Sequence, residues 1–353
     1  MASFRHSPYA FLSILDSRQR LRQLRISFLI VGLLAANSSF GIERGGESIQ
    51  DLMDKGRWEE VAVLVKESFG TDAPTPDQAF VFAKALVHLS RRGEALAVIN
   101  QAAKQSRGGA HKEVVRRLQV IARVYLTNES FQKSLEASNL LSAHKFGLAR
   151  ERFEKLAEIE PDNVEVLLRI AQTQISEGEG GLDAAVERLR LAKKLDPFLA
   201  DVDAWLGRAL YLRGEINPSL DQLKGAAENL PNSEPVHVWY AEALASAGQR
   251  GAAIQYLDRV GRTHPLFLDA LTNLARLRFS GAGRDKNALW SVRKDLQLLM
   301  SRMPDYLAAP ASVDPDDLGL DLRNAEDLKR RIDDLVGKVD ARVAALTGPD
   351  ESS

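Results

Sequence analysis

The sequence contains no cysteine and carries almost no net charge. It also has no long hydrophobic run in residues 26–36, because this apolar segment of eleven residues is too short to cross a bilayer comfortably. Without cysteine, the chain cannot build disulfides, thiolate zinc sites or iron–sulfur clusters, and it has no cysteine nucleophile or lipoprotein anchor. A formal net charge of −1 over 353 residues gives no electrostatic reason to expect nucleic-acid binding. These absences exclude much chemistry and leave a protein of ample hydrophobic content.

Residues 1–41 have the parts of a targeting segment. Residues 1–25 hold five arginines and one aspartate, residues 26–36 are uncharged and apolar, and small and polar residues follow. This order is typical of a secretory signal peptide with cleavage near residues 38–41, and it predicts a periplasmic or secreted bacterial protein. The alternatives are a signal anchor that holds the chain in the membrane by residues 26–36, a mitochondrial presequence, and a buried N-terminal helix. The basic leader leaves the remaining chain with a net charge of −5.

A sequence repeat runs through the middle of the chain and is marked by regularly spaced prolines. These prolines stand at 161, 197, 231, 265 and 304, at intervals of 36, 34, 34 and 39. Proline cannot continue a helix, so each is predicted to mark a helix end. Between them apolar residues recur at helical spacing, with a glycine such as Gly214 or Gly248 in the middle of the unit. Each unit is therefore predicted to be a helix, a tight turn and a second helix.

Small residues at 171, 207 and 241 fall at one place in successive first helices. Two antiparallel helices joined by a short turn cross closely there, and only glycine or alanine lets the backbones approach. This pattern, with Leu206–Gly207, Gly214, Ala226 and the closing prolines, resembles the tetratricopeptide repeat (TPR). The resemblance implies an all-α solenoid of about six or seven helix pairs over residues 42–304, clearest in 130–265 and degenerate in 47–129. The first aromatic residue of the family pattern is missing.

The C-terminal part changes character. Residues 305–323 read as an acidic, proline-containing linker, 324–347 as an amphipathic helix, and 348–353 as a disordered tail. Apolar residues recur in the helix at intervals of 3 and 4, which predicts one apolar stripe. A solenoid needs its last apolar face covered, so we expect this helix to be a cap. The alternative is a coiled-coil seam in a homodimer.

Catalytic and metal-binding patterns are absent from the sequence. The six histidines have no HxH, HExxH or HxxxH spacing, and the glycine-rich stretches at 178–181 and 281–284 are not followed by a Lys-Ser/Thr pair. We therefore expect a protein that is not an enzyme and that has no catalytic residue, metal site or cofactor.

The TPR resemblance implies that the first helices line a concave groove that binds protein or peptide. Transferred onto this chain, the groove positions include Lys84, His88, Gln172, Arg208, Leu212, Arg213, Glu242, Arg276 and Phe279. Apolar residues with interspersed arginines suit an extended peptide or a helix that carries an acidic residue. The Lys/Asn/Arg set by which chaperone-binding TPR domains hold a terminal carboxylate is not reproduced.

The sequence thus predicts a non-catalytic scaffold or adaptor, exported or membrane-anchored, that binds a partner protein in envelope assembly, secretion or polymer export. The alternatives are a self-associating structural or regulatory protein that dimerises through the C-terminal helix, and an enzyme accessory or glycan-binding groove. We expect no nucleic-acid partner and membrane contact only through the N-terminal segment. Groove composition does not identify the partner.

Overall fold

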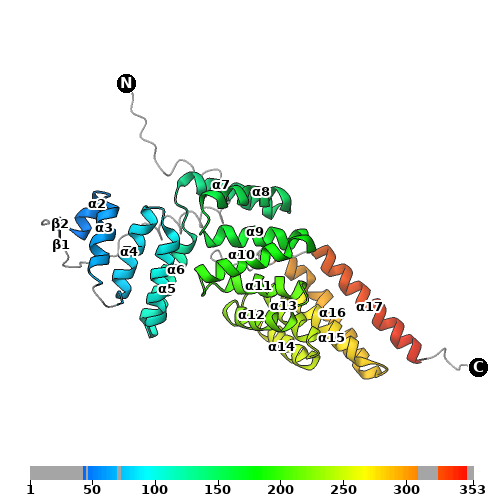
Figure 1. Ribbon diagram of the computed structural model, residues 1–353. Coiled ribbons are helices and arrows are strands. Elements are labelled where there is room, and N and C mark those ends of the chain that lie inside the picture. The colour runs from blue at the N-terminus through cyan, green and yellow to red at the C-terminus, as the bar shows by residue number, and fades with distance from the viewer. Residues whose placement is uncertain (1–42, 45–46, 70–72, 309–324, 348–353) are drawn as a thin grey trace, which may run out of the picture. The chain divides into compact units, whose positions relative to one another are not determined.

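The computed structural model describes residues 43–44, 47–69, 73–308 and 325–347 (Figure 1). The predicted leader, most of the predicted linker and the predicted tail lie outside these residues. Packing divides the chain into two units, with the division between Val202 and Asp203 inside helix α11. Apart from a pair of two-residue strands, β1 (Glu43–Arg44) and β2 (Glu47–Ser48), the regular structure described is helical. The predicted all-α fold class is confirmed.

The first unit consists of short helix pairs and one single helix. Its helices are α2 (Ile49–Asp54), α3 (Trp58–Glu67), α4 (Pro76–His88), α5 (Arg92–Gln105), α6 (Gly108–Arg123), α7 (Asn128–Ser142), α8 (Phe146–Ile159), α9 (Val164–Glu177) and α10 (Leu182–Leu195), with a 3-10 turn at Glu179–Gly181. Neighbours in sequence pack as antiparallel pairs, and α6 packs against α4, α5 and α9. Helix α6 is thus an insertion between pairs, in the region where the repeat is degenerate in sequence.

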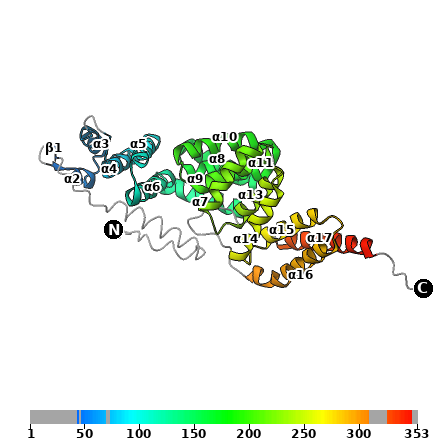
Figure 2. The same ribbon diagram turned by 90° about the horizontal axis from the view of Figure 1, so that it is seen from below.

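The second unit contains three regular pairs and a last helix. Its helices are α11 (Ala200–Leu212), α12 (Ile216–Asn229), α13 (Glu234–Ser246), α14 (Arg250–Thr263), α15 (Leu268–Ala282), α16 (Lys286–Ala308) and α17 (Ala325–Thr347). Figures 1 and 2 both show α17 beside α15 and α16, against which it packs.

The turns inside the pairs share one backbone geometry. In five pairs the first helix ends two residues before a residue with positive φ, and the second helix begins two residues after it. Glycine occupies this place at 56, 214 and 248, with φ of 71°, 82° and 76°. Ser90 and His144 hold the same place with φ of 59° and 55°. Because the left-handed region favours glycine, the turn at Gly214 was visible in the sequence, and those at Ser90 and His144 were not.

Close crossing of the paired helices explains the small residues. A Cβ atom built on Gly207 would lie 2.6 Å from Cγ of Leu223 on α12. The hydroxyl of Ser219, also on α12, donates to the Gly207 carbonyl at 2.8 Å. Ala171 and Ala241 are buried at the corresponding places of α9 and α13. The repeats are therefore TPR-like helix pairs, as predicted.

Four of the five periodic prolines lie in the connections between pairs, at 161, 197, 231 and 265. The prediction that Pro304 ends a helix is wrong, because α16 continues through Pro304 to Ala308. Its missing N–H deprives the Met300 carbonyl of an intrahelical partner. Met300 is exposed, so water can satisfy that carbonyl. The first four residues of the predicted linker, 305–308, accordingly belong to α16.

Helix α17 covers an apolar face of the second unit. Its stripe of Leu328, Ile332, Leu335, Val339 and Val343 is buried in one cluster with residues of α15 and α16. The same residues would have to form the seam of the alternative homodimer, and here they are occupied within the chain. This arrangement favours a cap over a dimer seam.

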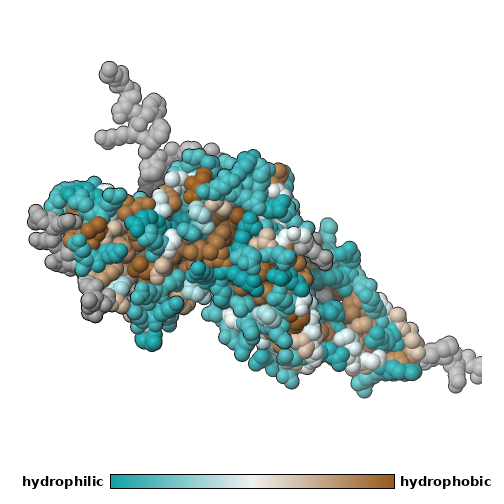
Figure 3. All heavy atoms as spheres, in the orientation of Figure 1, coloured by the Kyte–Doolittle hydropathy of each residue, from teal (hydrophilic) through white to brown (hydrophobic). Residues whose placement is uncertain are grey.

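Hydrophilic residues cover most of the face drawn in Figure 3, with hydrophobic residues gathered in patches between them. No helix in the described part of the chain combines the length and the apolar character that a membrane span requires. The apolar segment 26–36 of the leader lies outside that part.

Candidate functional site

Residues one repeat apart contact each other along the first helices of the second unit. Arg208 on α11 donates from Nη1 to Oε2 of Glu242 on α13 at 2.9 Å. Trp205 and Trp239 meet edge to face, with ring centroids 5.0 Å apart. In both pairs the partners occupy equivalent positions of successive repeats, so the repeat places these positions on one continuous face.

The guanidinium of Arg208 also lies over two aromatic rings. Its Cζ is 5.5 Å from the ring centroid of Trp239 and 5.4 Å from that of Tyr211. Such contacts add to the ion pair with Glu242 and orient the arginine along the helix face. Arg208 is therefore engaged within the protein.

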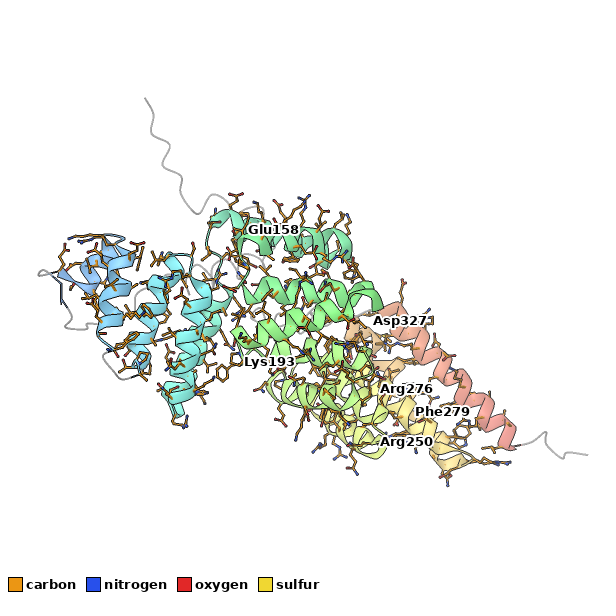
Figure 4. All side chains as sticks on the ribbon, in the orientation of Figure 1. Glu158, Lys193, Arg250, Arg276, Phe279 and Asp327 are labelled. Carbon is orange, nitrogen blue, oxygen red and sulfur yellow. The ribbon has the colours of Figure 1, made fainter. Side chains whose placement is uncertain are left out.

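A cavity of about 270 Å³ opens on this face. Its walls come from α11, α13 and α15, from the end of α16 and from the start of α17. The lining residues are Arg208, Glu234, Pro235, Val238, Trp239, Glu242, Asp269, Asn273, Tyr306, Asp327, Leu328 and Arg331. Figure 4 labels Asp327 at the start of α17. We call this cavity the α17 pocket.

Glu234 positions one wall of the α17 pocket. Its Oε1 accepts from the backbone N–H groups of Asp269 and Ala270, at 2.7 and 3.2 Å. These are the first turn of α15, which has no side-chain cap of its own. A carboxylate from α13 thus satisfies free N–H groups and complements the helix dipole of the next repeat.

Arg331, also in the lining, joins α17 to α15. Its Nη1 donates to Oδ1 of Asp269 at 2.7 Å, and its Nε lies 2.9 Å from Oδ2 of Asp327. Burial by itself would lower the pKa of Arg331, but the hydrogen bond and the charges of the two aspartates raise it above the ordinary value. Arg331 therefore stays positively charged, and Asp269 and Asp327 balance its charge.

Four predicted residues of the second unit do not line the α17 pocket. Phe279 is buried in the cluster under α17, with Arg342 of α17 stacked on its ring at 4.0 Å. Its prediction as an open groove residue is wrong because the cap covers that end of α15. Arg276, labelled in Figure 4, is exposed on α15, and its Nη2 donates to Oδ1 of Asn273 at 3.1 Å. Leu212 and Arg213 are exposed at the end of α11, and Arg213 pairs with Glu215.

In the first unit, Lys84 and His88 lie together on α4 beside an aromatic residue of α3. The rings of His88 and Trp58 stack at 3.8 Å, and Nζ of Lys84 is 5.7 Å from the Trp58 ring centroid. Partial burial lowers the pKa of Lys84, and burial together with the charge of Lys84 lowers the pKa of His88. The predicted neighbours are thus brought together, with Trp58 as a partner that sequence reasoning did not include.

Gln172 is fully buried, so its prediction as a groove residue is wrong. It accepts a hydrogen bond from Arg169 at 3.0 Å. Every residue of α9 from Val164 to Ile175 is buried, and within the first unit α9 packs against α6, α8 and α10. Helical spacing placed Gln172 on the inner face of a first helix but did not reveal that this face is covered.

A second cavity, of about 450 Å³, lies between α13 and α14. It is lined by Tyr240, Leu244, Gln249, Ala252, Gln255, Tyr256, Asp258, Arg259 and Arg262. Asp258 is already engaged by Arg262 and Arg278. No three histidines, aspartates or glutamates in the described ranges are grouped so that they could hold a metal ion.

Most residues of the α17 pocket were missed from the sequence. The repeat period relates Trp205 to Trp239 and nearly relates Glu234 to Asp269, so comparison of successive repeats could have found these positions. No sequence signal places Asp327, Leu328 and Arg331 in one pocket with residues of α13 and α15. The amphipathic pattern of α17 predicts that it packs but does not say on which helices.

The sequence matches no protein-family model, and it matches no curated protein. Solved structures with similar folds include a type IV pilus biogenesis factor, PilW, at 20% identity over 64% of this chain and 96% of that one, with a TM-score of 0.45. They also include MamA (residue 41 to the end) from Desulfovibrio magneticus RS-1, at 13% identity over 51% and 97% of the two chains, TM-score 0.43. A third is TTC0263, a TPR protein of Thermus thermophilus, at 18% identity over 57% and 98%, TM-score 0.36. These likenesses concern the fold alone.

Proposed function

We propose that this chain is a non-catalytic scaffold that binds a partner protein along the inner face of its first helices. The observation that carries the proposal is the continuous face of α11, α13 and α15, on which the repeat stacks Arg208 on Glu242 and Trp205 on Trp239. A preformed face built from successive repeats can bind through many modest contacts without ordering itself first. Exposed Leu212 and Arg276 add apolar and charged contacts beside this face.

We further propose that the protein is exported and acts in envelope assembly, secretion or polymer export. Support comes from the order of basic, apolar and small residues in the leader. A fusion of residues 1–45 to alkaline phosphatase tests the compartment, because this reporter is active only outside the cytoplasm. Phosphatase activity is expected, and its absence in a stably expressed fusion would remove export from the proposal.

Site-specific photocrosslinking in the native host tests partner binding. A photoreactive residue at Leu212 or at Arg276 should crosslink to the same discrete partner. The control position is Arg262, which is exposed on α14, a second helix, and should give no such product. Equal crosslinking from all three positions, or no product from any, would contradict binding on the first helices.

A further inference from the structure

The charges of the α17 pocket favour a cationic ligand. Its lining holds four carboxylates, Glu234, Glu242, Asp269 and Asp327, against two arginines. Arg208 is paired with Glu242, Arg331 with Asp269 and Asp327, and Arg330, which is outside the lining, also with Asp327. The lining itself therefore holds two more carboxylates than arginines.

Glu242 presents one carboxylate oxygen to the α17 pocket. Its Oε2 accepts from Arg208, and the described residues supply no hydrogen bond to its Oε1. About a quarter of the side chain is exposed, so that oxygen can be reached from solvent. The arginine holds one carboxylate oxygen of Glu242 in place, so the second oxygen is oriented to accept a hydrogen bond from a charged ligand group.

The size and the walls of the pocket suit a long side chain with an apolar stem. Its volume of about 270 Å³ is below the roughly 300–1,000 Å³ of sites that enclose small-molecule ligands. Pro235, Val238, Trp239, Tyr306 and Leu328 provide apolar surface beside the carboxylates. Lysine and arginine combine a methylene stem with a charged head and use both parts in such surroundings.

We propose that the α17 pocket binds a lysine or arginine side chain of the partner polypeptide. This inference rests on the proposed scaffold function and specifies the chemistry of the partner. It differs from the expectation of an acidic partner, because two of the three predicted groove arginines, Arg208 and Arg213, are paired with Glu242 and Glu215. Helix α17 supplies Asp327, Leu328 and Arg331, so the capping helix contributes to recognition as well as to packing.

Fluorine NMR of the full chain labelled with 5-fluorotryptophan provides the test. The chain has four tryptophans, and the Trp239→Phe variant assigns the resonance of Trp239. The probe is N-acetyl-arginine amide, and its neutral isostere, N-acetyl-citrulline amide, is the matched ligand control. We expect the arginine probe to shift the Trp239 resonance with saturation and the citrulline probe to leave it in place. An equal response to both probes, or none to either, would overturn the proposal.

Charge-removing variants identify the carboxylates involved. Glu242→Gln keeps an acceptor for Arg208 and removes the charge, and together with Asp327→Asn it should weaken the arginine probe by about tenfold or more, the usual scale for lost charged hydrogen bonds. Glu326→Gln makes the same charge change at an exposed neighbour outside the pocket and should leave binding unchanged. Unchanged affinity in the Glu242→Gln/Asp327→Asn variant, with normal helicity by circular dichroism, would also overturn the proposal.

The two proposals fail in distinguishable ways. If the pocket does not bind the arginine probe while Leu212 and Arg276 still crosslink to one partner, the scaffold function stands and the basic anchor is wrong. If the pocket binds the probe and neither position crosslinks, the pocket stands and the scaffold function is wrong.

Discussion

Arg92 and Glu160 form a buried ion pair in the first unit, with Nη2 of the arginine 2.7 Å from Oε2 of the glutamate. The two residues are far apart in sequence, at the start of α5 and just after α8. Oε1 of Glu160 accepts from the backbone N–H of Leu126 at 2.8 Å, and Arg92 also donates to the Val124 carbonyl. The pair therefore joins the connection that follows α6 to two helices that are distant in sequence.

Replacement of Arg92 by methionine should destabilise the first unit by about 3–5 kcal/mol, because Glu160 would remain as an unpaired buried charge. Urea unfolding and hydrogen exchange in α5 and α8 measure this loss. Arg92→Met combined with Glu160→Met should recover part of the stability, since the unpaired charge is gone. Arg91→Met is the control: Arg91 pairs with exposed Glu94, and its loss should leave the exchange pattern unchanged. A small effect of Arg92→Met would show that the pair is not structurally important.

Gly207→Ala should destabilise the second unit by about 1–3 kcal/mol, because the new Cβ would lie within 3 Å of Leu223 and force the helices apart. Gly225→Ala on α12 makes the same chemical change at a helical position with no atom within 4 Å. That variant should gain about 0.5–1 kcal/mol from the better helix propensity of alanine. Urea unfolding of both variants gives the comparison. Equal effects at the two positions would contradict a tight crossing at Gly207.

Sequence periodicity predicted the helix pairs well because it reports contacts inside one repeat. The roles of Gly207 and Gly214 could be predicted from the residue type alone, because a close helix crossing and a left-handed turn each favour glycine. His144 has the same turn geometry without the signal. Pro304 has the residue type that predicts a helix end, but α16 continues through it. A proline close to a helix end leaves only one exposed carbonyl unpaired, so the helix tolerates it.

The candidate site was less predictable, because it depends on contacts between elements far apart in sequence. Arg208 and Glu242 were identified and lie together, since one repeat period separates them. Phe279 and Gln172 were assigned to an open groove, and both are covered. The packing of α17 on α15 buries Phe279 and completes the α17 pocket. The amphipathic pattern of α17 indicates that this helix packs against others, but it does not indicate which ones.

The stability of the second unit should fall on acidification through His237. This buried side chain lies with Nε2 2.9 Å from the Pro231 carbonyl, so Nε2 carries the hydrogen, and Nδ1 accepts from the Tyr256 hydroxyl. Burial lowers the pKa of His237, partly opposed by the bond to Pro231 and reinforced by the charge of His264. Burial also raises the pKa of Tyr256, so that hydroxyl stays protonated.

A histidine with a lowered pKa contributes stability above its unfolded-state pKa of about 6.5, and this contribution is lost as the pH falls through the folded-state pKa. Wild type should therefore lose more stability between pH 7 and pH 5 than His237→Gln, which can donate and accept but does not titrate. Urea midpoints across this range measure the difference. Parallel pH profiles for the two proteins would show that His237 does not titrate differently on folding.

Ile332→Ala distinguishes a capping helix from a dimer seam. Ile332 is a residue of α17 that is fully buried against α15 and α16. Its truncation should therefore lower the free energy of unfolding of the second unit in urea by about 2–5 kcal/mol. Lys338→Ala on the exposed side of α17 is the control and should change stability by less than about 0.5 kcal/mol. Because the stripe is buried within the chain, light scattering should give the same molar mass for wild type, Ile332→Ala and Lys338→Ala. A wild-type dimer that dissociates only in Ile332→Ala would instead identify α17 as the seam and would require its stripe to leave α15 and α16.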